Sequence, residues 1–213
     1  MKSSSSGPPS AMLVASRASV QLFIARGSSD VSIRELAAHV GISERTFYRY
    51  FPRKEDVVRP FLENGLQRIV DGFAARSASE PIMDSLAAAW ADAWPLKEPG
   101  ASAVFFRILE QHDSYRAARL QAIIDSEALW AEAIATRLGL APSSPQALVA
   151  GAAIVTAFRM AWQSFSLDPT LDPLATLIRN FHFFSALLAT PAEAADTGHF
   201  NHITQKTGNQ HVR

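Results

Sequence analysis

The sequence has no cysteine among its 213 residues and no net charge, since 20 Lys and Arg balance 20 Asp and Glu. The lack of cysteine excludes a disulfide-stapled fold and any thiolate zinc site. The charge balance excludes a uniformly basic, histone-like binder of nucleic acid. Because 48% of the residues are hydrophobic, the chain can bury a sizeable core, which excludes intrinsic disorder over its whole length.

Long apolar runs and strand patterns are scarce as well. The longest unbroken apolar run in the second half is Ala147–Val155, well short of the ~20 residues that a membrane span needs. The first ten residues lack the apolar stretch of a signal peptide, and no sustained alternation of apolar and polar residues marks a strand. We therefore expect a cytoplasmic protein without a membrane partner.

Apolar residues instead recur at helical spacing along the chain. With Ser N-caps and Gly stops, this spacing predicts nine helices, at residues 11–26, 33–40, 44–51, 54–76, 81–94, 101–112, 114–138, 145–165 and 173–189. We expect an all-α fold with four parts. These are a lead-in at 1–10, a three-helix domain at 11–58, a helical bundle at 59–189 and a loose polar tail at 190–213.

Two short helices around Gly41-Ile42 have the sequence form of a helix-turn-helix. Ser32 and Glu35 form a capping box before the first helix, and Gly41 supplies the turn. The second helix has an apolar stripe formed by Phe47, Tyr50 and Phe51. Its opposite face carries Glu44, Arg45, Tyr48 and Arg49.

That polar face has the chemistry to contact bases. Arg takes guanine bidentately, Glu accepts a hydrogen bond from cytosine, and Thr46 suits a thymine methyl or a phosphate. Arg34, Lys54 and the amides near Ser32 and Ser43 are better placed for phosphates. The spacing alone also fits a solvated helix hairpin whose charges recognise nothing.

Residues 32–57, SIRELAAHVGISERTFYRYFPRKEDV, resemble the DNA-binding region of the TetR family. The Ala-x-x-x-Gly turn, Thr46-Phe47-Tyr48, Tyr50-Phe51 and Lys54-Glu55 occur together at fixed spacing. The resemblance implies an all-α homodimer in which three N-terminal helices bind DNA and the other helices hold a small-molecule effector. One departure is that the residues just before the first helix lack the Arg or Lys that family members often carry, so we expect no DNA-contacting arm.

Carried over position by position, the resemblance implies which residues contact DNA. The major-groove positions are Arg34, Glu44, Arg45, Thr46, Tyr48 and Arg49. The backbone-contacting positions are Ser32, Tyr50 and Lys54. The implied partner is double-stranded DNA with a pseudo-palindromic operator, because a homodimer presents two recognition helices.

Residues 108–139 resemble, less closely, the C-terminal domains of TetR-family regulators that bind acyl-CoA-like ligands, including mycofactocin-system regulators. They share an Arg-x-x-Arg step and a late Ala-x-Arg-x-Gly. Large apolar residues of the bundle would either line an effector cavity or fill the core. They are Trp90, Trp94, Phe105, Phe106, Trp130, Phe158, Met160 and Trp162.

Arg107 and Arg159 each interrupt an apolar stretch. A buried guanidinium needs a partner, which is either an internal carboxylate or an anionic group of the effector. The internal candidates are Glu110, Asp125 and Glu127. We therefore expect a small lipophilic effector, and an anionic one if these arginines face it.

The last two predicted helices are the expected dimer surface. Gly151 permits close helix approach, and an apolar stripe is formed by Leu177, Phe181, Phe184 and Leu188. Two such helices from each subunit would form a four-helix bundle. The alternative is that the stripe packs inward within one chain.

No catalytic constellation stands out, and the histidines lack the i, i+4 pairing and carboxylate support of a metal site. We expect neither enzyme activity, a cofactor nor a metal. The charge is also uneven, since residues 1–60 hold nine Lys and Arg against five Asp and Glu. The leading hypothesis is a ligand-released repressor. An enzyme on an α-bundle and an architectural DNA-binding protein without an effector are the alternatives.

Overall fold

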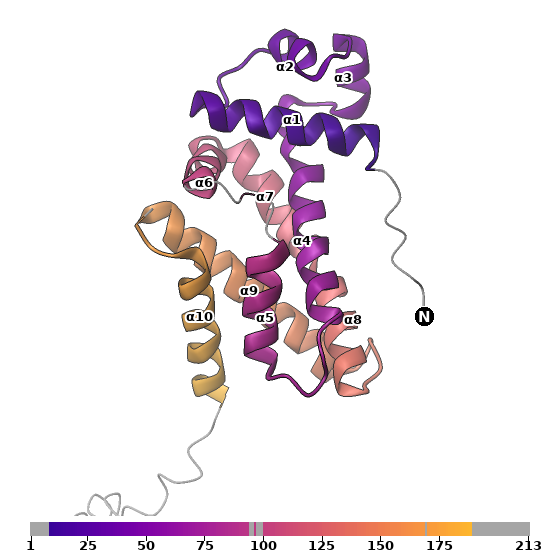
Figure 1. Ribbon diagram of the computed structural model, residues 1–213, viewed down its shortest axis with the longest axis vertical. Coiled ribbons are helices and arrows are strands. Elements are labelled where there is room, and N and C mark those ends of the chain that lie inside the picture. Colours follow the sequence, from indigo (N-terminus) through magenta and orange to yellow (C-terminus); the bar gives the residue numbers. More distant parts are fainter. Residues whose placement is uncertain (1–8, 94–95, 97–99, 169, 189–213) are drawn as a thin grey trace, which may run out of the picture.

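The computed structural model describes residues 9–93, 96, 100–168 and 170–188. Over these residues the chain forms ten α-helices, one 3-10 helix and no strand, which confirms the all-α fold class. Three helices come first: α1 (Ala11–Arg26) and the two shorter helices α2 (Ile33–Val40) and α3 (Glu44–Tyr50). They lie together across one end of the other helices (Figure 1).

After the short η1 (Lys54–Val58), the remaining described helices form the bundle. They are α4 (Arg59–Ala74), α5 (Ile82–Ala93), α6 (Ala101–Gln111), α7 (Asp113–Asp125), α8 (Glu127–Leu138), α9 (Pro145–Leu167) and α10 (Pro173–Leu188). α4 leads from the N-terminal helices into this bundle, and α9 crosses behind α5 (Figure 1). The predicted tail at 190–213 lies outside the described residues.

The ends of the short helices follow the predicted capping chemistry. The hydroxyls of Ser10, Ser32 and Ser43 each accept a hydrogen bond from the backbone N–H three residues later, at 3.1–3.2 Å. Gly41 ends α2 with φ 79°, a left-handed conformation in which a side chain is strained. These local signals fix where α2 stops and α3 begins.

The prediction of nine helices is wrong, because two of the predicted helices are each divided into two in the structure. The segment predicted at 54–76 is η1 followed by α4, because Pro60 has no N–H to continue a helix from η1 and lies instead in the first turn of α4. The segment predicted at 114–138 breaks at Ser126. There both the backbone N–H and the hydroxyl of Ser126 bond to the Ile123 carbonyl, at 3.1 and 2.6 Å.

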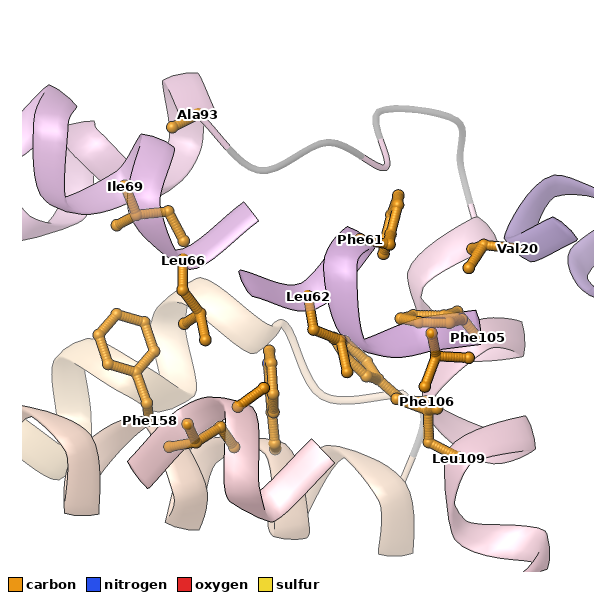
Figure 2. Packing of buried hydrophobic residues seen from close by; sticks show 14 of the residues in the cluster. Val20, Phe61, Leu62, Leu66, Ile69, Ala93, Phe105, Phe106, Leu109 and Phe158 are labelled. Carbon is orange, nitrogen blue, oxygen red and sulfur yellow. The ribbon is translucent and has the colours of Figure 1, made fainter. Parts of the chain in front are cut away.

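The large aromatic residues fill the core of the bundle. Phe105, Phe106, Trp130, Phe158 and Trp162 are each at most 1% exposed. Their rings contact one another, with centroids 4.9 Å apart for Phe106 and Trp162. Figure 2 shows Phe105 and Phe106 beside residues of α4. This supports the core interpretation over an aromatic-lined cavity.

The other members of that set lie elsewhere. Trp90 is 5% exposed and stacks on Phe158, whereas Met160 is 46% exposed on α9. Trp94 lies outside the described residues.

Helix α9 is the longest helix among the described residues, with 23 residues. Its stretch Pro145–Phe165 has a mean hydropathy of 1.2 and is long enough to cross a membrane by length and composition. However, 44% of the stretch is buried against other helices, and a core helix satisfies the same criterion. A Cβ on Gly151 would lie 2.8 Å from the Glu127 carbonyl oxygen, so this glycine lets α9 approach α8 closely.

Candidate nucleic-acid interface and hollows of the bundle

Helix α3 is held from below by two buried rings. Phe47 and Phe51 are 0% and 1% exposed, and their centroids lie 5.1 Å apart. Because these rings point inward, the other face of α3 is turned to solvent. The exposed residues there are Glu44, Arg45, Tyr48 and Arg49, as the sequence predicts.

Two of the predicted contacts have structural partners of their own. Tyr50 is half-buried against the Phe51 ring, and the Arg49 guanidinium lies 5.3 Å from the Tyr50 ring centroid. Lys54 Nζ donates to the Ser29 carbonyl at 3.1 Å, which ties η1 to the loop before α2. Lys54 therefore positions the domain, and its ammonium keeps donors to spare for a phosphate.

The remaining predicted contacts lie at helix starts. Ser32, Arg34 and Ser43 are exposed, and Thr46 is half-buried beside the Ser43 hydroxyl, 3.0 Å away. The Ser32 backbone N–H and hydroxyl bond to Glu35 and hold the pKa of that carboxyl below its usual value. These caps occupy the N–H groups of Ser32, Glu35 and Thr46, and the other first-turn N–H groups of α2 and α3 have a geometry that suits phosphate oxygens.

A buried serine joins this domain to the bundle. Ser16 is 0% exposed, donates its hydroxyl to the Val57 carbonyl and accepts from the Phe61 N–H at 3.0 Å. Arg17 of α1 adds a hydrogen bond of 2.7 Å to Asn64. This link could not be predicted from the sequence, in which its only signal is a small polar residue on the buried side of α1. These hydrogen bonds tie α1 to η1 and to the first turns of α4.

Helix α7 also touches α1. The Tyr115 ring packs edge-on against Phe23 at 6.0 Å, and burial raises the pKa of Tyr115 above its usual value. Near the other end of α7, Asp125 pairs with Arg59 at 2.8 Å. The Arg59–Asp125 pair joins α7 to α4, and α1 is contacted by α4, α6 and α7 of the bundle and by η1.

The bundle has an apolar hollow of about 690 Å³. Residues of α5, α8, α9 and α10 line it, among them Met83, Leu86, Ile134, Ile154 and Phe181. The volume lies within the ~300–1,000 Å³ range of small-molecule sites. The large aromatics expected to line a cavity do not line this one.

A second hollow of about 380 Å³ lies between α6, α7 and α9. Its lining residues are Glu110, Arg116, Arg119, Leu120, Arg159, Gln163 and Leu167. Arg159 is thus at a site, although its side chain is exposed. Arg107 is exposed on α6 and lines neither hollow, so neither of them is an effector pocket that contains Arg107 as predicted. Its neighbours Phe106 and Ile108 take the buried positions.

The residues predicted for the dimer surface lie mainly inside the chain. Gly151 faces α8, and Leu177 and Phe181 are 1% and 7% exposed. This favours the alternative in which the stripe packs inward. The side chains of Phe184 and Leu188 lie outside the described residues.

Comparisons with known proteins agree with this architecture. Residues 17–59 match the family described as bacterial regulatory proteins, tetR family. No curated protein matches the chain. Among solved structures, the chain is similar to a tetR-family transcriptional regulator from Streptomyces coelicolor, with 17% identity and a TM-score of 0.56. That match covers 84% of this chain and 82% of the other.

The chain is also similar to a protein from Shewanella sp. PV-4 described as a tetR family transcription regulator. The identity is 20%, the TM-score is 0.51, and 84% of this chain and 98% of the other are covered. At these identities the two structures support the fold alone, over the 84% of this chain that each covers. Neither match bears on the acyl-CoA or mycofactocin resemblance of residues 108–139.

Proposed function

We propose that this chain, whose residues 17–59 form a tetR-family N-terminal domain, is a homodimeric repressor that a small lipophilic effector releases from DNA. The observation that carries the proposal is the exposed face of α3, which holds two guanidiniums above the buried Phe47. We place the DNA-binding domain at residues 11–58 and the effector and dimerisation domain at 59–189.

The charge distribution supports an orientation in which the N-terminal domain faces the DNA. Residues 1–60 have a surplus of four positive charges, which the remaining chain balances. A basic end is drawn to DNA while the acidic body is kept from it. Two copies related by a two-fold axis would place their α3 helices in successive major grooves, about 34 Å apart, so the operator would be pseudo-palindromic.

Replacing Arg45 with alanine is expected to weaken operator binding by ~1–3 kcal/mol and to relax specificity at one base position. The reason is that an exposed Arg at the start of a recognition helix suits bidentate contact with guanine. The operator is first selected from DNA upstream of the gene. Binding to it is then measured by fluorescence anisotropy at a fixed salt concentration. Arg107→Ala is the control, because it also removes one positive charge from an exposed Arg, but on α6. Equal affinity of Arg45→Ala and the parent protein would contradict the assigned docking.

We place the effector's apolar part in the hollow lined by α5, α8, α9 and α10. An apolar hollow of about 690 Å³ favours an effector-controlled protein over an architectural one with a filled core. The effector opposes DNA because it prefers a conformer in which the two α3 helices no longer match the half-sites. A gel-shift screen of lipophilic acids and their acyl-CoA esters tests this assignment, and release of DNA is the expected result.

The dimer surface is proposed on the exposed side of the last two helices. Met160, Leu167 and Phe183 are 46%, 82% and 62% exposed there. Exposed apolar side chains on two neighbouring helices fit an isologous four-helix interface.

Combining Met160→Glu with Phe183→Glu is expected to convert the dimer into monomers and to weaken operator binding at least tenfold. Four carboxylates would lie in one interface without partners, and a monomer reaches only one half-site. Light scattering after size exclusion measures the mass. Ile124→Glu is the matched control because Ile124 is 53% exposed on α7. A doubly substituted chain that remains dimeric places the interface elsewhere.

A further inference from the structure

We propose that the hollow between α6, α7 and α9 binds the oxyanion group, a carboxylate or phosphate, of a small molecule. This site is distinct from the apolar hollow, and its occupation does not depend on DNA binding. Two features of this hollow indicate an oxyanion: an excess of positive charge and one buried arginine.

Positive charge exceeds negative charge in this hollow. Arg116, Arg119 and Arg159 line it with Glu110 as the single carboxylate. Asp113, which lies outside the lining, pairs with Arg116 at 2.7 Å and is 94% exposed. Even with Asp113 counted, one positive charge remains without an opposite charge. The unbalanced positive charge is that of Arg159, which has no ion-pair partner among the described residues.

Arg119 is the buried member of the group, with a side chain only 5% exposed. Its Nη2 lies 2.5 Å from Glu110 Oε1, although the two are not aligned for a hydrogen bond. Its Nε and Nη1 are buried without any hydrogen-bond partner. Burial lowers the pKa of Arg119, which reflects the cost of removing this charge from water.

An oxyanion would supply both the hydrogen-bond acceptors that Arg119 lacks and the negative charge that the hollow lacks. A guanidinium presents its N–H groups as a planar fork, which a carboxylate or phosphate meets with two parallel hydrogen bonds. Glu110 does not fill this role alone, because its Oε2 accepts from Arg116 Nε at 3.0 Å. A ligand between Arg119 and Arg159 would supply the missing acceptors and the missing negative charge.

The rest of the lining indicates the kind of molecule. Leu120 and Leu167 line the hollow beside the charges, and Gln163 adds an amide. A volume of about 380 Å³ suits a small ligand with a short apolar part. The site therefore fits a small amphipathic acid.

Titration calorimetry without DNA tests the proposal, with inorganic phosphate, octanoate and octanol as probes at constant ionic strength. We expect octanoate or phosphate to bind saturably with one site per chain. Arg159→Gln should weaken that binding at least tenfold, and Arg107→Gln, which changes an exposed Arg outside the hollow, should leave it unaltered. Absence of saturable binding by both anions, or equal binding by Arg159→Gln, would overturn the proposal.

Two controls keep the result specific. Octanol tests the apolar hollow, so if octanol displaces octanoate, the octanoate site is that hollow and the proposal fails. Size exclusion tests a second occupant, a carboxylate of another copy. If Arg159→Gln loses both the anion and the dimer, the arginines serve an interface and the proposal also fails. A chain that binds the anion but no DNA would refute the regulator and leave this site standing.

Discussion

Replacing Phe47 with alanine is expected to lower the free energy of unfolding by about 3–5 kcal/mol, the usual cost of truncating a buried aromatic residue. Phe47 is fully buried and packs edge-on against Phe51 beneath α3. A helix of 7 residues is not stable in isolation, so both the formation and the position of α3 depend on this packing. The same change should therefore abolish operator binding although Phe47 contacts no DNA.

Urea unfolding followed by circular dichroism measures the stability, and anisotropy measures the binding. Tyr48→Ala is the matched control, because it removes a neighbouring aromatic ring that is 50% exposed. That variant should keep its stability and lose affinity only. If Phe47→Ala unfolds at the same urea concentration as the parent protein, α3 is not held by this core.

The N-terminal domain could be predicted closely because its signals are local. Ser32 and Ser43 cap their helices through the backbone three residues on, and Gly41 adopts the one conformation that such a turn requires. The helical periodicity of α3 places Phe47 on the face opposite Arg45 and Arg49, and this follows from the order of residues in that helix alone. Each of these features depends on residues close in sequence, so the sequence carries them directly.

The bundle could not be predicted as closely because its features depend on distant partners. The break at Ser126 has no glycine or proline to mark it, and the helices on either side of it, α7 and α8, both pack on α4. An arginine within an apolar run is buried or exposed according to its helical phase. Arg107 faces solvent, whereas Arg119, in a more polar stretch, is buried against Glu110 and Trp162. The Arg-x-x-Arg step was the only signal that pointed to Arg119.

Replacing Glu110 with glutamine is expected to destabilise the chain toward the lower end of the ~3–5 kcal/mol that breaking a buried ion pair costs. The change leaves the Arg119 charge buried without its carboxylate. The lower end applies because the Glu110 side chain is 28% exposed, so water relieves part of the loss. Thermal and urea unfolding measure the effect, and Asp113→Asn, which removes an exposed partner of Arg116, should change stability little.

A second substitution separates charge from packing. In the chain carrying both Glu110→Gln and Arg119→Met, no buried charge remains, and Met retains much of the packing of the Arg stem against Trp162. Stability should therefore return toward that of the parent protein. Phosphate should raise the melting temperature of Glu110→Gln more than that of the parent, because it replaces the lost carboxylate beside Arg119. It should leave the double variant unaffected. If the double variant is as unstable as Glu110→Gln, then Glu110 stabilises the chain through Arg116 and not through Arg119.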